Sequence, residues 1–147
     1  MKALCIALAA VVLAGLGCAT HVSIAETRRE DIATRSRVLA IAARNLDEAV
    51  RKYTATPAEQ EAAQAVAQFH NEAEHFARAS ERWLSTDNVN DSYETLIDAW
   101  HKAKEAFAKL KPDALTAESW QRTVYEWEKL ERATGYSGAS YEKRGRK

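Results

Sequence analysis

The sequence contains few of the residues that interrupt helices or cross-link chains. Among 147 residues there are 5 glycines, 2 prolines, 2 cysteines and 1 methionine. Only one cysteine, Cys18, lies outside the first ten residues, so the remainder of the chain cannot form an internal disulfide. Alanine, glutamate, lysine, arginine and glutamine dominate the middle of the chain, and these residues favour helices. The composition therefore predicts an all-α protein of one domain.

Excess charge and catalytic motifs are also lacking. The 21 basic and 21 acidic residues balance, so we expect no nucleic-acid partner. The sequence has no Gly-x-Ser-x-Gly, no glycine-rich phosphate loop and no Cys-x-x-Cys-His. Its one methionine is Met1, which excludes the Met/His ligation that some haem proteins use. We therefore expect a non-enzymatic protein without a cofactor.

The first 18 residues have the three parts of a secretory signal. Lys2 provides a positive start, an apolar stretch of roughly 14 residues follows, and small residues precede Cys18. This stretch is shorter than the ~20 residues that cross a bilayer as a helix. The run Leu-Ala-Gly-Leu-Gly-Cys at residues 13–18 resembles the signal sequence of bacterial lipoproteins, with Gly15 where leucine is commonest.

This resemblance implies that residues 1–17 are a signal peptide and that Cys18 receives a diacylglycerol and becomes the new N-terminus. Residues 18–22 would then form a lipidated tether, residues 23–135 a helical bundle domain, and residues 136–147 a flexible basic tail. The expected location is a bacterial cell envelope, with the protein held to the membrane by its lipid.

Ala19 directly after the cysteine favours the outer membrane, facing the periplasm. The alternative is a soluble periplasmic protein, cut after Ala19 or after Ala25, because Ser-Ile-Ala at residues 23–25 has the small-x-small form of an ordinary cleavage site. A cytosolic protein that keeps residues 1–18 as a helix ranks last, because that run has no amphipathic face.

Capping signals and apolar spacing predict four helices. Ser-Ile-Ala-Glu at residues 23–26 has the form of a capping box and opens a helix that runs to about residue 53. Thr-Pro-Ala-Glu at residues 56–59 is a stronger box and opens a second helix, which runs to about residue 83.

The second half of the chain contains two further helices. Residues 85–90 are predicted to be a turn-rich break, after which Asn90 or Asp91 caps a third helix that ends at residues 111–113. The fourth helix is expected to begin near Thr116 and to end at residues 135–138.

Four amphipathic helices with short connections predict an antiparallel up-down-up-down four-helix bundle. The first two predicted helices are longer than the last two, so they could project as an extended hairpin. Apolar residues at positions 62, 69, 76 and 83 repeat every seventh residue. This spacing also suits coiled-coil packing, which leaves a homodimer open.

Two short motifs resemble the Glu-x-x-His pairs of di-iron bundles. They are Glu72 with His75, and its aspartate counterpart Asp98 with His101. At ~100° per residue, each histidine lies about 120–130° from the apolar face of its helix, so these ligands should face solvent. His70 and Glu74 lie one turn apart, but two ligands are too few for a tight metal site. We therefore expect no metal centre.

Aromatic residues supply the candidates for partner binding. The four tryptophans fit the apolar faces of their helices, which favours core packing. Trp83 lies near a helix end, where a partly exposed indole could bind a partner. Tyr136 and Tyr141 lie outside any helical pattern on a glycine-containing segment, and they are the other candidates.

The combined features predict a lipid-anchored binding or assembly protein of the cell envelope, with an envelope protein as its partner. The architecture resembles pilotins, small helical lipoproteins that escort secretion-channel subunits. Those with four helices carry a disulfide that this chain cannot form. The alternative is a periplasmic helical bundle that binds a metal or a small ligand through its histidines.

Overall fold

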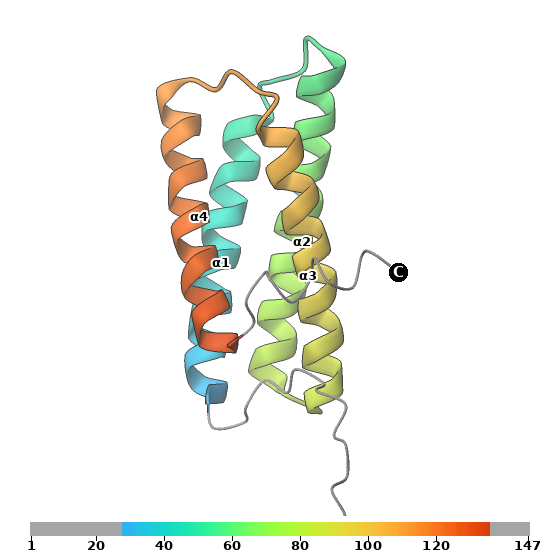
Figure 1. Cartoon of the computed structure of the whole chain (residues 1–147), viewed down its shortest axis with the longest axis vertical. Coiled ribbons are helices and arrows are strands. Elements are labelled where there is room, and N and C mark those ends of the chain that lie inside the picture. The colour runs from blue at the N-terminus through green and yellow to red at the C-terminus, as the bar shows by residue number, and fades with distance from the viewer. Residues whose placement is uncertain (1–27, 136–147) are drawn as a thin grey trace, which may run out of the picture.

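The computed structural model describes residues 28–135, and these residues form four α-helices joined by short connections. The helices run up, down, up and down along one axis (Figure 1). α1 packs against α2 and α4, and α2 packs against α3. The predicted antiparallel four-helix bundle is therefore confirmed. Its elements are α1 (Arg29–Val50), α2 (Pro57–Arg82), α3 (Thr86–Phe107) and α4 (Ala114–Thr134).

The start of α2 has the predicted capping box. Thr56 Oγ1 accepts a hydrogen bond from the backbone N–H of Glu59 at 3.2 Å, and Glu59 Oε2 accepts one from the Thr56 N–H at 3.1 Å. Pro57 occupies the first turn, where its missing N–H leaves no bond unmade. Two of the free donors at the helix start are thereby satisfied, which fixes the boundary.

The start of α3 differs from the prediction. The helix begins at Thr86, and Ser85 caps it by accepting a hydrogen bond from the Asn88 N–H at 3.1 Å. Residues 86–90 are therefore helical rather than a turn, and neither Asn90 nor Asp91 is the cap. Val89 explains the extension, because it is fully buried and continues the apolar face of α3 by one turn.

The first helix also differs in extent. α1 ends at Val50, ahead of the predicted residue 53, and α1 and α3 each have 22 residues while α2 has 26. In the described part of the chain, α2 is therefore longer than α3, whereas α1 and α3 are equal in length. The expected cap at residues 23–26 lies outside the described residues.

Tyr53 connects the two loops at the upper end of Figure 1. Its hydroxyl accepts a hydrogen bond from the Asp113 N–H at 2.8 Å and lies 3.4 Å from Thr116 Oγ1. Lys52 forms an ion pair with the Asp113 carboxylate. Asp113 also caps α4, which begins at Ala114 rather than near Thr116. The α1–α2 and α3–α4 connections are thus held together.

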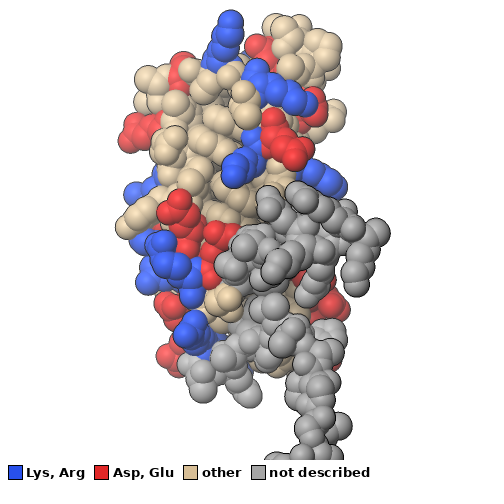
Figure 2. Space-filling model, viewed as in Figure 1, with Lys and Arg blue, Asp and Glu red and all other residues tan. Residues whose placement is uncertain are grey.

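Stacked aromatic side chains join α3 to α4. Trp120 lies between Phe107 and Trp100, with ring centroids 4.2 Å and 5.2 Å away. Trp100 also stacks on Trp127 at 5.0 Å, and Trp127 lies 6.3 Å from Tyr93. Trp100 and Trp127 are buried and Trp120 is half-buried. In the upper half of Figure 2, uncharged side chains form a continuous area in the middle of this face, with charged side chains around it. The tryptophans therefore pack in the core, as predicted.

Candidate functional site

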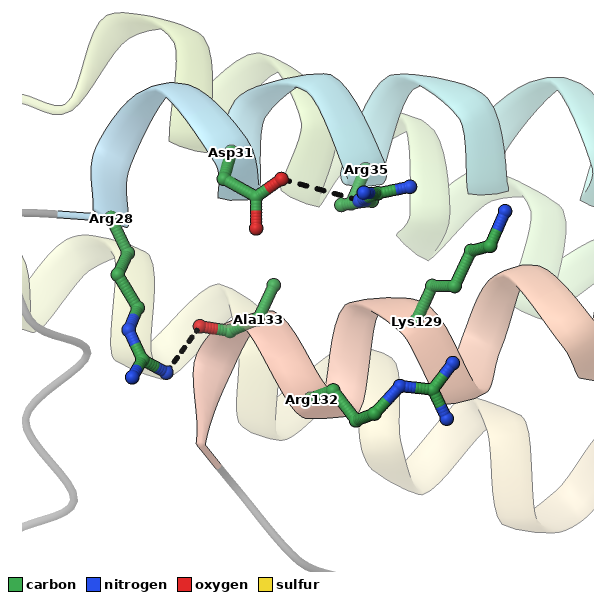
Figure 3. A pocket seen from close by; sticks show the side chains of 6 residues that line it. All are labelled: Arg28, Asp31, Arg35, Lys129, Arg132 and Ala133. Atoms are coloured by element: carbon green, nitrogen blue, oxygen red, sulfur yellow. Dashed lines mark hydrogen bonds and ion pairs between the residues drawn. The ribbon is translucent and has the colours of Figure 1, made fainter.

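A cleft of about 520 Å³ opens between the start of α1 and the end of α4. It lies at the lower end of the bundle in Figure 1, where residues 28 and 135 both lie. We refer to it as the α1–α4 cleft. Six residues line it: Arg28, Asp31 and Arg35 from α1 and the residue before it, and Lys129, Arg132 and Ala133 from α4 (Figure 3).

The spacing of the lining residues explains why they share one cleft. Positions 28, 31 and 35 lie three and four residues apart, so they follow one edge of α1. Positions 129, 132 and 133 follow one edge of α4 in the same way. Between these edges, Ile32 and Leu130 are fully buried and hold the two helices together. The cationic side chains therefore flank an apolar contact.

Two arginines of the cleft are partly engaged. Arg28 Nη1 donates a hydrogen bond to the backbone oxygen of Ala133 at 3.4 Å, which bridges the cleft (Figure 3). Arg35 Nε donates to Asp31 Oδ1 at 3.2 Å. A guanidinium has five N–H donors, so both arginines keep donors for a ligand.

The two cations of α4 complete the cleft. Lys129 Nζ lies 3.7 Å from Glu126 Oε1 and 4.0 Å from the centroid of the Tyr125 ring. Arg132 is exposed, and it forms no hydrogen bond or ion pair among residues 28–135. Within the described part of the chain, the lining thus contains four cations and one carboxylate. This net positive charge favours an anionic ligand.

A second polar cluster lies between α1 and α2. His70 Nδ1 is 3.1 Å from Asp47 Oδ2, and His70 Nε2 is 3.2 Å from Glu74 Oε1. Arg51 Nη2 also donates to Asp47 Oδ2, at 2.8 Å. The His70 side chain is 13% exposed and that of Asp47 is 4% exposed. The hydrogen bond with His70, followed by that from Arg78, lowers the pKa of Glu74.

The geometry of this cluster suits a structural hydrogen-bond network, because both imidazole nitrogens lie within hydrogen-bond distance of carboxylates from α1 and α2. A metal ion needs a ring nitrogen whose lone pair is free. In residues 28–135, no group of three or more His, Cys, Asp or Glu side chains has the arrangement of a metal site. His70 and Glu74 do lie together as the sequence suggested, whereas Asp47 of α1 was missed.

The di-iron-like motifs do not converge in the core. His75 and Asp98 are exposed, and His101 is half-buried. Trp100 of α3 is buried against Phe69 of α2, with their ring centroids 5.2 Å apart, and fills the interior between the two helices that carry the motifs. The expectation that these side chains point away from the apolar faces agrees with their positions.

The environment of Trp83 differs from the partly exposed position that the sequence suggested. Its side chain is 8% exposed, so the indole is buried rather than available to a partner. The backbone has φ 41°, a left-handed conformation that ends α2. Arg29 lies over the ring at 5.9 Å and donates to the carbonyl oxygens of Glu81 and Arg82 at 3.3 Å and 3.2 Å. The residue thus ends a helix and packs against α1.

The remaining predicted site residues, Cys18, Tyr136 and Tyr141, lie outside the described residues. The α1–α4 cleft itself was not predicted. Its two cationic edges are about a hundred residues apart in the sequence, and neither edge alone forms a charge run. Only the contact between α1 and α4 brings them together.

Comparisons with known proteins gave no match among family models, curated proteins or solved structures. Of the four helices in the described part of the chain, none combines the length and the hydropathy needed to cross a membrane. The fold is a four-helix bundle, and the α1–α4 cleft is the feature of the described residues that points to a function.

Proposed function

We propose that the protein is a lipid-anchored, non-enzymatic helical bundle of the bacterial cell envelope that serves as a binding or assembly protein. The observation that carries this proposal is the α1–α4 cleft, because a concave cationic site on a rigid helical scaffold suits the binding of an anionic group. The lipoprotein-like signal at residues 1–18 supports the anchor.

The position of the cleft agrees with an anchor at Cys18. Nine residues lie between Cys18 and Arg28, which is the first residue of the cleft. Even fully extended, such a link spans no more than about 35 Å. A lipid on Cys18 would therefore keep the cleft close to a membrane surface.

The anchor is tested by metabolic labelling with palmitate in a bacterial host, followed by membrane flotation. We expect the wild-type chain to incorporate label and to float with membranes, and the Cys18→Ala variant to do neither. Cys5→Ala is the matched control, because it removes the other cysteine from within the signal peptide and should label normally. Unchanged flotation of Cys18→Ala would refute the anchor.

The binding role is tested by crosslinking in membranes that carry the wild-type chain. We expect an adduct that is lost in the double variant Arg35→Gln/Arg132→Gln. It should persist in Arg44→Gln/Lys102→Gln, which removes two exposed cations outside the cleft. An adduct of twice the chain mass would identify a homodimer. If every adduct is insensitive to the cleft variants, the cleft is not the binding surface.

The alternative function, a helical bundle that binds a metal through its histidines, is tested by measuring the melting temperature at increasing zinc concentrations. A ligand that prefers the native state raises the melting temperature with its concentration. Because His70 is held by two carboxylates, we expect no rise with zinc. A rise that is abolished by His70→Gln would favour the alternative instead.

A further inference from the structure

We propose that the α1–α4 cleft binds the phosphate group of an anionic lipid headgroup, so that the lower end of the bundle faces the lipid surface. This proposal deepens the function proposed above and rests on it for the choice of a lipid over free phosphate. The four cations, the donors they leave free and the position of the cleft carry the argument.

The cleft keeps a net positive charge, although Arg35 pairs with Asp31 and Lys129 lies near Glu126. Four cations, Arg28, Arg35, Lys129 and Arg132, face one space of about 520 Å³, and among residues 28–135 Asp31 is the only carboxylate in its lining. Like charges that line one cleft repel one another, and an anion bound among them reduces that repulsion. A phosphate group fits this arrangement, because its non-bridging oxygens, two in a phosphodiester and three in phosphatidic acid, can accept hydrogen bonds from several donors at once.

The donors are suited to phosphate in kind as well as charge. Three of the four cations are arginines, whose planar guanidinium groups bind phosphate oxygens in pairs. Arg132 makes no hydrogen bond within residues 28–135, and Arg35 uses only Nε on Asp31. Donors from both helices are thus available to the same ligand.

The position of the cleft favours a lipid as the source of the phosphate. Arg28 lines the cleft and lies ten positions after Cys18 in the sequence. Next to Lys129, Tyr125 is 50% exposed, and tyrosine and lysine together are common at membrane interfaces. An anchored protein would therefore bring this cleft to the headgroups.

Leu84 gives an independent indication that this end faces lipid. It lies in the connection between α2 and α3, at the lower end of Figure 1, and is 79% exposed. A smaller cavity of about 230 Å³ beside it is lined by Arg78, Arg82 and His75, among others. An exposed leucine next to arginines suits insertion of the apolar side chain between headgroups.

The attraction between the lower end of the bundle and anionic headgroups should be confined to its α1–α4 side. The first turns of α3 carry Asp87, Asp91 and Glu94, so α3 lacks the positive charge of the α1–α4 side. The bundle would therefore meet the surface with its α1–α4 side closer to the headgroups. This orientation is specific enough to be measured.

The first experiment follows the melting temperature of the full-length chain in neutral detergent micelles. Three probes are titrated: inorganic phosphate, soluble dihexanoyl phosphatidic acid and dihexanoyl phosphatidylcholine. We expect the phosphatidic acid to bind at least tenfold more tightly than inorganic phosphate, and phosphatidylcholine to give no shift. Arg35→Gln/Arg132→Gln should weaken binding at least tenfold, and Arg44→Gln/Lys102→Gln should bind like wild type.

Each other outcome overturns the proposal. Equal affinity for inorganic phosphate and phosphatidic acid would make the cleft a site for free phosphate. Equal weakening in both double variants would mean a non-specific charge effect, and no shift with any probe would mean no site. Both double variants change exposed or half-exposed side chains, so a wild-type melting temperature without ligand verifies that they fold.

A second experiment tests the orientation by hydrogen exchange in vesicles. With the full-length chain reconstituted, peptides around residues 82–88 and 126–135 should exchange more slowly in phosphatidylglycerol vesicles than in phosphatidylcholine vesicles. Leu84→Ser should reduce this protection at residues 82–88. Leu115→Ser is the matched control, because Leu115 is 72% exposed at the opposite end. Protection at residues 108–116 instead would refute the orientation.

The two proposals fail separately. Titration in micelles does not depend on the lipid at Cys18, and palmitate labelling does not depend on the cleft. If the protein is labelled with palmitate but its cleft does not bind phosphatidic acid, the anchor stands and the headgroup site is refuted. If the protein is not labelled but its cleft binds phosphatidic acid, the headgroup site stands and the anchor is refuted.

Discussion

The indole rings of Trp100 on α3 and Trp127 on α4 stack with their centroids 5.0 Å apart and their planes 18° apart. Both side chains are nearly inaccessible to solvent, at 5% and 3% exposure. The close backbone approaches of the bundle are between α1 and α2, α2 and α3, and α1 and α4. Aromatic stacking therefore supplies much of the contact between α3 and α4.

We predict that Trp127→Ala lowers the free energy of unfolding by ~3–5 kcal/mol, because it leaves a large cavity between α3 and α4. Trp120→Ala should have a smaller effect, since this indole is half-buried. Tyr125→Ala, in the same helix and 50% exposed, is the control for helix content. Urea unfolding measures the free energy of unfolding of all three variants. Equal losses would mean that the stacked indoles stabilise the bundle no more than the exposed Tyr125 ring does.

The left-handed backbone of Trp83 leads to a second prediction. Among the described residues, it is the only one other than glycine with positive φ. Trp83→Ala and Trp83→Gly both remove the buried indole, but only glycine adopts this conformation without steric strain. The glycine variant should therefore be about 1 kcal/mol more stable than the alanine variant. At position 79, within α2, alanine should be the more stable residue: Ala79→Gly should lower the free energy of unfolding in the same denaturation assay.

The boundary of α3 can be tested through its cap. Ser85→Ala removes the acceptor for the Asn88 N–H and should lower the free energy of unfolding by about 1 kcal/mol. Asp91→Ala changes an exposed side chain within the helix and should stay within about 0.5 kcal/mol of wild type. If Asp91→Ala were the more damaging change, the helix would begin later, as the sequence alone had suggested.

The pKa of Glu74 predicts a dependence of stability on acid. Its pKa is lowered in the folded state, chiefly by the hydrogen bond with His70, with Arg78 adding to the effect. A lowered carboxyl pKa contributes stability above the ordinary value of 4.5, and this contribution is lost as the pH falls below that value. Glu74→Gln should therefore be less stable than wild type at pH 6, and the difference should shrink towards pH 3.

Chemical denaturation at several pH values checks this prediction. Asp47 also faces His70 and has Arg51 as a partner, so the cluster contains two carboxylates and two arginines around one imidazole. Glu72→Gln is the control, because it removes a carboxylate from α2 without a hydrogen bond to His70. A difference between Glu74→Gln and wild type that stays constant with pH would contradict the assignment.

Helix number, order and direction could be predicted because local signals decide them. The capping box at Thr56 and the apolar spacing of α2 are contained in short stretches of sequence. The start of α3 was mispredicted for the opposite reason. Residues 86–88 favour turns by propensity, but the cap at Ser85 and the burial of Val89 in the bundle outweigh that preference.

The cleft could not be predicted because it depends on tertiary packing. The total charge of the chain is balanced, and from the sequence it predicted only that no nucleic acid is bound. It conceals the local imbalance that arises when Arg28 and Arg35 come beside Lys129 and Arg132. Asp47 was missed for a similar reason, since its partner His70 lies on the next helix. Pairing between helices is not contained in the spacing along either one.

The closeness of Arg28 and Gly135 has a mechanical consequence. The guanidinium of Arg28 reaches the end of α4, where its Nη1 donates to the Ala133 carbonyl oxygen and would lie 3.9 Å from a side-chain carbon built on Gly135. The start of α1 and the end of α4 therefore lie at the same end of the bundle (Figure 1). Opposing forces applied at these two points would peel α4 from α1 one turn at a time, starting at the cleft. Peeling breaks contacts in sequence rather than together. A pull between the start of α1 and the end of α4 would thus open the α1–α4 cleft first, while the hydrogen bond between Tyr53 and Asp113 still holds the opposite end closed.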